Sequence, residues 1–182
     1  MNRNKQSNIF WFTGLSGAGK TTIATTLYNF LVNKGYGVKI LDGDEIRKEI
    51  HFDLGFSKKD IEKNNLKIAE LCISLMSAYE IILVPIISPF ISVRKKVKKM
   101  IGAGFNEIYI DIPLSSAINR DVKGLYKKAL KGQIDNFIGI DPSIPYEPPT
   151  KPDLVISTDK ESISSSVEKL FDYILVKVKK NG

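Results

Sequence analysis

The sequence predicts a three-layer α/β fold with a mainly parallel central sheet, because short apolar runs alternate with helical patterns along the chain. The runs are continuously hydrophobic, which indicates strands covered on both faces. Right-handed crossovers would bring the carboxyl ends of these strands to one edge, where ligands are expected to bind. The five expected strands are 9–13, 38–41, 81–85, 107–111 and 154–156.

Two of the connecting helices have clear periodicity. Apolar side chains recur every three or four residues from Ile68 to Tyr79 and again from Val167 to Val178, so each helix has one face that must pack on the sheet. The first stripe contains Cys72, the only cysteine, which we therefore expect in the core. A single cysteine excludes an intrachain disulfide, and with the polar residues 1–7 it favours a cytoplasmic protein without a signal peptide.

The length of 182 residues suffices for one well-buried core, so we expect a single domain over 1–182. Residues 120–152 are rich in Gly, Pro and Lys and form a longer connection than usual, which predicts a lid. The net charge of +7 suits a polyanionic partner such as a nucleotide. No nucleic-acid-binding module is recognisable and no apolar run is long enough to span a bilayer, so neither nucleic acid nor a membrane is expected as a partner.

A phosphate-binding motif follows the first strand. Residues Gly14 to Thr21 match the Gly-x4-Gly-Lys-Thr pattern of a P-loop, at the strand-to-helix turn that its mechanism requires. Lys20 should bridge the β- and γ-phosphates of ATP, and Thr21 should ligate Mg²⁺. The alternative interpretation is a glycine-rich turn that binds no ligand, but such a turn would have no need for a lysine followed by a threonine. The expected contacts to ATP are Gly14, Ser16, Gly17, Ala18, Gly19, Lys20, Thr21 and Thr22.

Two carboxylates and an arginine follow the second strand, at the same predicted edge of the sheet. A carboxylate at Asp42 or Asp44 can orient an acceptor hydroxyl, take its proton or hold Mg²⁺ through water, and Arg47 can bind an anionic group. Asp42 alone could instead only cap the next helix. The third and fourth strands lack a clear Walker B carboxylate, and no Asn-Lys-x-Asp signature is present, so direct phosphoryl transfer fits better than a motor or a GTPase. The lone His51 is expected to be structural rather than a general base.

With these motifs the chain resembles the adenylylsulfate kinase family, which phosphorylates the ribose 3′-hydroxyl of adenylyl sulfate in sulfate activation. The resemblance covers nearly the whole chain. It implies a P-loop kinase and commonly a homodimer. The matching blocks are 11–22, 42–47, 54–64, 87–94, 120–129 and 137–152.

The resemblance also implies roles for single residues. Asp44, together with Lys20, would be catalytic, because it would handle the accepting hydroxyl, and Arg120 would pack on the base of ATP. Phe56 and Phe137 would sandwich the base of the acceptor. The full set of implied acceptor contacts is Asp42, Asp44, Arg47, Phe56, Asn64, Ser88, Lys123 and Phe137.

The acceptor half of the chain departs from the family pattern. Ile61 and Ile91 stand where arginines are usual, and Asn-x-Arg-Arg has become residues 64–67, Asn-Asn-Leu-Lys. A lost charged hydrogen bond costs roughly 1.5 to 3 kcal/mol. The alternative is therefore a related enzyme with another acceptor, such as cytidine diphosphoramidate kinase of capsule modification. Nearby lysines could also replace the lost charge, namely Lys58, Lys59, Lys63 and Lys67.

Overall fold

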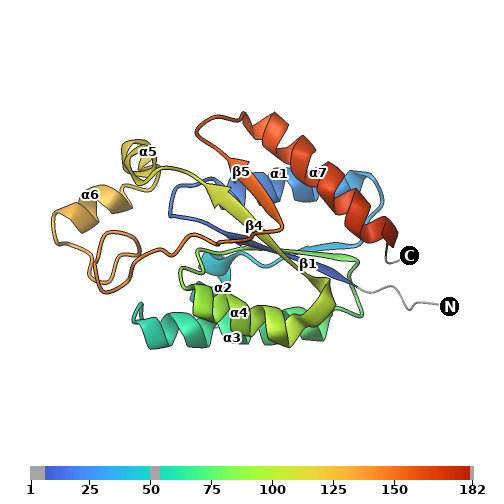
Figure 1. Ribbon diagram of the computed structural model, residues 1–182, viewed down its shortest axis with the longest axis horizontal. Coiled ribbons are helices and arrows are strands. Elements are labelled where there is room, and N and C mark those ends of the chain that lie inside the picture. The colour runs from blue at the N-terminus through green and yellow to red at the C-terminus, as the bar shows by residue number, and fades with distance from the viewer. Residues whose placement is uncertain (1–6, 50–53, 181–182) are drawn as a thin grey trace.

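The computed structural model describes residues 7–49 and 54–180, and its centre is a parallel sheet (Figure 1). The strand order is β2-β3-β1-β4-β5, and all neighbouring strands run parallel. This confirms the predicted architecture; the largest difference is that β4 begins two residues earlier than expected. His51 lies outside the described residues. The strands are β1 (Asn8–Thr13), β2 (Val38–Ile40), β3 (Ile81–Pro85), β4 (Phe105–Asp111) and β5 (Leu154–Ser157).

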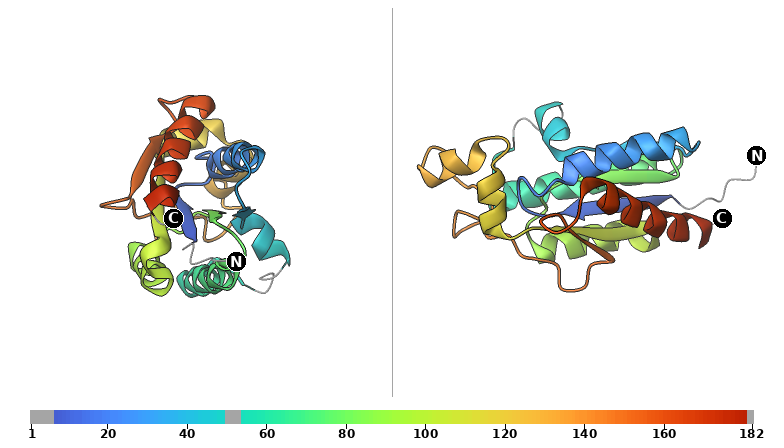
Figure 2. Two further views of the ribbon diagram at one scale, coloured as in Figure 1. Left: turned by 90° about the vertical axis from the view of Figure 1, so that its right-hand side faces the viewer. Right: turned by 90° about the horizontal axis from the view of Figure 1, so that it is seen from above.

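Helices cover both faces of the sheet. α1 and α7 pack together on one face, and α3 and α4 pack together on the other (Figures 1 and 2). Among the described helices, none is both long and apolar enough to cross a bilayer. The helices are α1 (Lys20–Asn33), α2 (Gly43–Glu49), α3 (Lys58–Leu75), α4 (Ile91–Ile101), α5 (Leu114–Arg120), α6 (Leu125–Leu130) and α7 (Ile163–Lys180), with a 3-10 turn at Gly102–Gly104.

The central strand β1 explains why its sequence is hydrophobic throughout. Phe10 and Phe12 belong to the core on the α1 and α7 side, whereas Ile9 and Trp11 belong to the core under α3 and α4. All four side chains are fully buried. Each contributes about 1.5–3 kcal/mol through burial. The strand that leads into the P-loop is therefore held rigidly from both faces.

The helix α3 carries the predicted core cysteine and a well-defined start. Cys72 is buried as expected, and burial raises the pKa of its thiol to about 12, so it stays protonated. At the other end, the Ser57 hydroxyl oxygen accepts a hydrogen bond from the Asp60 amide at 3.2 Å and caps the helix. This cap fixes where the chain enters the helix, and thereby where Phe56 is presented.

The stretch predicted as a lid extends beyond the end of the sheet that is farthest from both chain ends (Figure 1). The chain leaves α5 at Arg120, forms the short helix α6, and returns through a long loop to β5. Two anchors hold its first turn: the Asp121 carboxylate accepts hydrogen bonds from the amides of Tyr126 and Lys127. The segment thus contains one ordered helix within an extended connection.

Candidate active site

A cavity of about 460 Å³ opens at the carboxyl ends of β1, β2 and β3, as expected for this fold. The P-loop, α2, the start of α3, the end of β3 and the lid segment all contribute to its walls. Four of the predicted site residues, Gly14, Ala18, Ser88 and Arg120, do not line it. Those that do are Ser16, Gly17, Gly19, Lys20, Thr21, Thr22, Asp42, Asp44, Arg47, Phe56, Asn64, Lys123 and Phe137.

The P-loop is folded around its lysine. Lys20 is buried, and its ammonium donates hydrogen bonds to the carbonyl oxygens of Gly14 at 3.0 Å and Leu15 at 2.7 Å. Burial lowers the pKa of Lys20 to about 8 despite the nearby carboxylate of Asp44. At Gly14 a Cβ would lie 2.4 Å from the carbonyl oxygen of Ile110, so this position accepts no side chain.

Thr21 and Asp42 form a pair of oxygen donors beside the P-loop. The Thr21 hydroxyl donates to Oδ2 of Asp42 at 2.8 Å, and Oδ1 of Asp42 accepts from the amide of Asp44 at 2.9 Å. Asp42 therefore caps α2 and also contacts the P-loop threonine. Hydroxyl and carboxylate oxygens are the ligands that Mg²⁺ prefers, so this pair fits that ion. Among the described residues no cluster of three His, Cys, Asp or Glu side chains could hold a metal by itself.

An ion pair crosses the mouth of the cavity. Lys123 of the lid segment donates to Oδ2 of Asp44 on α2, and both side chains are mostly exposed to solvent. Exposed pairs of this kind contribute about 0 to 1 kcal/mol. The contact therefore links residues 120–152 to α2 without fixing them there.

Arg47 organises the segment that precedes α3. Its guanidinium donates to the carbonyl oxygens of Leu54 at 2.8 Å and Gly55 at 2.7 Å. The guanidinium carbon Cζ lies 4.3 Å from the centroid of the Phe56 ring. Phe56 remains about half exposed. An aromatic ring with one covered and one open face is suited to stacking against a planar ligand.

The comparisons with known proteins agree with this geometry. The family model for adenylylsulphate kinase matches residues 6–157. An adenylyl-sulfate kinase of Halothermothrix orenii is 46% identical over 173 residues, which is 94% of this chain and 91% of that protein. The chain belongs to the adenylylsulphate kinase family.

Two solved structures extend the comparison to the fold of the family. The Mycobacterium tuberculosis APS kinase, solved in complex with AMPPNP and APS, is 37% identical and has a TM-score of 0.87, with 93% of this chain and 98% of that chain covered. A hexameric APS kinase from Thiobacillus denitrificans is 27% identical, with a TM-score of 0.68, and 96% of this chain covers 30% of that longer chain.

Two residues that support the P-loop were missed by the sequence reasoning. The buried Tyr126 donates its hydroxyl to the carbonyl oxygen of Ser16 at 2.9 Å, and burial raises its pKa to about 12. The Thr158 hydroxyl donates to the carbonyl oxygen of Ala18 at 2.9 Å and accepts from Arg120 at 3.2 Å. Arg120 thus lies beside the P-loop without lining the cavity. Tyr126 falls in a block that matches the adenylylsulphate kinase family, but its sequence position alone gives no sign of a P-loop contact.

The departures from the family pattern have a structural counterpart. Ile61 lines the cavity and packs in an apolar cluster with Phe90 and Val93 of the α4 region and Ile138 and Ile144 of the lid segment. Where the resemblance implies an arginine, Ile61 thus makes apolar contact between α3 and the lid segment. The four lysines considered as replacements do not line the cavity; the basic residues in its walls are Lys20, Arg47 and Lys123.

Ser88, which the resemblance implies as an acceptor contact, stays a prediction. Its side chain is buried, its hydroxyl has no hydrogen-bond partner, and it does not line the cavity. The neighbouring wall is formed by Ile86 and Ile87 instead. Ser88 also has a positive φ of 46°, which is rare for a residue other than glycine.

Proposed function

We propose that this kinase transfers the γ-phosphoryl group of ATP to the ribose 3′-hydroxyl of adenylyl sulfate, which yields 3′-phosphoadenylyl sulfate and ADP. The observation that carries the proposal is the convergence of a P-loop and an acceptor-type carboxylate, Asp44, in one cavity. Relatives with 42–46% identity that are named adenylyl-sulfate kinases support adenylyl sulfate over the cytidine compound as the acceptor.

The phosphate side of the site binds and orients ATP. Lys20 exchanges its bonds to the loop carbonyls for oxygens of the β- and γ-phosphates. Thr21 and Asp42 would hold Mg²⁺, which when bound would supply positive charge to offset the charge that develops on the phosphoryl oxygens. Arg120 packs on the ATP base from its place beside the P-loop.

The acceptor side presents the hydroxyl in line with the γ-phosphate. Asp44 orients the 3′-hydroxyl and accepts its proton, for which Lys123 must release the carboxylate that it now contacts. The acceptor base stacks between Phe137 and the open face of Phe56, and Arg47 and Asn64 contact the rest of the nucleotide. Closure of the lid excludes water and so suppresses hydrolysis of ATP.

The same proposal includes the surroundings of the enzyme. We place it in the cytoplasm, where ATP is supplied and Cys72 stays reduced, and expect a homodimer as the resemblance implies. Light scattering coupled to size-exclusion chromatography measures the mass in solution. A monomer mass at micromolar concentration would remove the dimer from the proposal and leave the reaction untouched.

The deciding experiment follows ADP release with MgATP and compares adenylyl sulfate with cytidine diphosphoramidate as the acceptor. Phosphorus NMR should identify a new 3′-phosphate on adenylyl sulfate. Preference for the cytidine compound, or turnover of neither, would refute the acceptor assignment. The Asp44→Asn variant should lose about two to four orders of magnitude in rate while MgATP binding persists. Loss of MgATP binding in that variant would contradict the role given to Asp44.

A further inference from the structure

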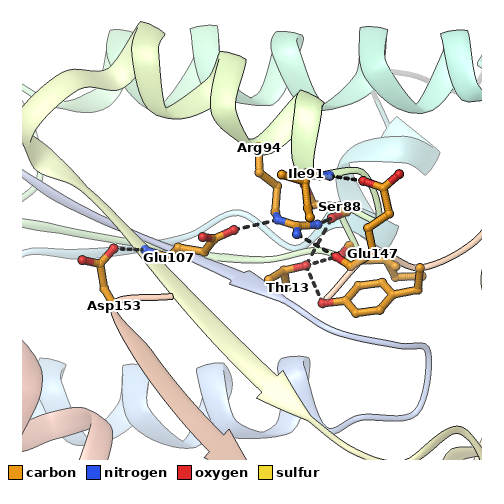
Figure 3. Close-up of polar contacts among 9 residues, drawn as sticks. Thr13, Ser88, Ile91, Arg94, Glu107, Glu147 and Asp153 are labelled. Carbon is orange, nitrogen blue, oxygen red and sulfur yellow. Dashed lines mark hydrogen bonds and ion pairs between the residues drawn. The ribbon is translucent and has the colours of Figure 1, made fainter. Parts of the chain in front are cut away.

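A buried arginine of α4 joins the turn before α4, the strand β4 and the end of the lid segment (Figure 3). Arg94 of α4 is almost fully buried. Its guanidinium donates to Oε1 of Glu107 on β4 at 2.6 Å, to the carbonyl oxygen of Ser88 at 2.7 Å, and to the carbonyl oxygen of Glu147 at 2.7 Å. The first partner neutralises the charge, and the other two are backbone atoms next to the site. Arg94 therefore fixes the turn at Ser88 and the end of the lid segment at Glu147 relative to each other.

The choice of arginine follows from this arrangement. A guanidinium carries five N–H donors in one rigid plane, whereas an ammonium is a single point from which three separated acceptors are hard to reach. Burying such a charge costs free energy unless it is paired and hydrogen-bonded. Both conditions are met at Arg94, because Glu107 pairs with its charge and two carbonyl oxygens accept further hydrogen bonds from it.

One of the carbonyls belongs to a strained turn. Ser88 has a φ of 46° and precedes Pro89, a place where the backbone of the preceding residue is already restricted. Such a conformation persists only where neighbouring groups hold it. The Ser88 carbonyl oxygen accepts from Arg94 and also from the Thr13 hydroxyl at 3.2 Å. Ile86 and Ile87, which line the cavity, directly precede this turn.

The other carbonyl belongs to the end of the lid segment. The Glu147 amide donates to the carbonyl oxygen of Pro89 at 2.9 Å, and its carboxylate accepts from the amide of Ile91 at 2.7 Å. With the bond from Arg94, Glu147 is thus held by three hydrogen bonds to the turn and the start of α4. Phe137 of the same lid segment lines the same cavity as Ile86 and Ile87.

We infer that Arg94 is a positioning residue for the acceptor nucleotide. It sets the spacing between the cavity wall at Ile86 and Ile87 and the lid segment that carries Phe137, and it acts through the backbone of Ser88 and Glu147. The inference rests on the proposed function. It predicts that loss of Arg94 affects the binding of the acceptor and the binding of ATP differently. Among the described residues, Arg94 reaches the P-loop only through the turn at Ile87 and Ser88, whose carbonyl oxygens accept from Gly14 and Thr13, so ATP binding should depend on it much less than acceptor binding does.

The test compares Arg94→Met and Arg94→Lys with a matched core variant, Leu170→Ala, which removes a fully buried side chain of α7 on the other face of the sheet. Calorimetry measures the Kd of MgAMPPNP, and steady-state kinetics measures KM for adenylyl sulfate. Arg94→Met should raise the acceptor KM about tenfold or more, as expected for lost charged hydrogen bonds, while the AMPPNP Kd stays within about twofold. Arg94→Lys should show a smaller rise, and Leu170→Ala should lower Tm without changing the acceptor KM.

Hydrogen–deuterium exchange gives a readout that does not require turnover. In Arg94→Lys the amides of Ile91 and Glu147 should exchange faster than in the wild type, and those of β1 should not. An unchanged acceptor KM in folded Arg94→Lys would overturn the inference. Equal increases in the acceptor KM and the MgAMPPNP Kd, in proportion to the loss of Tm, would also overturn it. If Arg94→Met does not fold, Arg94→Lys decides. A wild type inactive on adenylyl sulfate would instead refute the proposed function, and unaltered exchange in Arg94→Lys would still refute the positioning role of Arg94.

Discussion

The buried lysine of the P-loop makes ATP binding depend on pH in a specific direction. Burial lowers the pKa of Lys20 to about 8 in the nucleotide-free protein, while bound phosphates favour its charged form. The protonated fraction then falls from about nine-tenths at pH 7 to about one-tenth at pH 9. Because only the charged form binds well, the Kd for MgAMPPNP should rise about tenfold across this range. The affinity is thus present below the pKa and lost above it.

Calorimetry at several pH values tests this dependence and counts the protons involved. Binding should take up about 0.1 proton at pH 7 and about 0.9 at pH 9, measured in buffers of different ionisation enthalpy. Lys20→Arg is the control, because a guanidinium keeps its charge throughout this pH range. The variant should bind MgAMPPNP more weakly, and its Kd should not change between pH 7 and pH 9. A wild-type Kd that changes less than about twofold, or an equal step in Lys20→Arg, would refute the reasoning.

Three other predictions concern the surroundings of the P-loop. Gly14→Ala should abolish MgAMPPNP binding in calorimetry, because its Cβ would meet the Ile110 carbonyl oxygen at 2.4 Å, whereas Gly37→Ala, whose nearest contact is 3.8 Å, should bind normally. Tyr126→Phe removes the bond to the Ser16 carbonyl and should weaken MgAMPPNP binding by roughly 0.5–1.5 kcal/mol; full wild-type affinity would exclude the contact as a support. Asn65→Leu removes a buried Oδ1 that has no partner together with the bond from Nδ2 to the Ile61 carbonyl oxygen at 2.8 Å, so these effects should largely cancel; thermal unfolding should show a change in the free energy of unfolding below about 1.5 kcal/mol, and a larger loss would contradict this.

The fold could be predicted because its signals are local and repeated. Each strand is a short apolar run, and β1 is hydrophobic throughout because Phe10 and Trp11 pack on opposite faces. The P-loop was equally readable, since its glycines and the Lys20-Thr21 pair have a fixed spacing imposed by phosphate geometry. Asp44 and Arg47 followed from the rule that strand ends share one edge of the sheet.

The remaining parts of the site depend on contacts that have no sequence signal. Arg94 acts through backbone carbonyls, and every residue has a carbonyl, so its partners could not be identified from residue types. The burial of Ser88 follows from a left-handed turn that its own side chain does not favour. At Ile61 the sequence showed the loss of a charge, but only the packing shows that the lid now contacts this side chain.

Trp11 is the only tryptophan of the chain, and it lies fully buried in the strand that leads into the P-loop. Its indole is surrounded by apolar side chains and stands near Phe105 at a ring distance of 6.2 Å. The tryptophan fluorescence of the protein therefore comes from Trp11 alone, and its emission maximum lies at a short wavelength while the indole is shielded from water. Unfolding must shift that emission to the red, so each change in stability discussed above can be followed optically in the unlabelled protein.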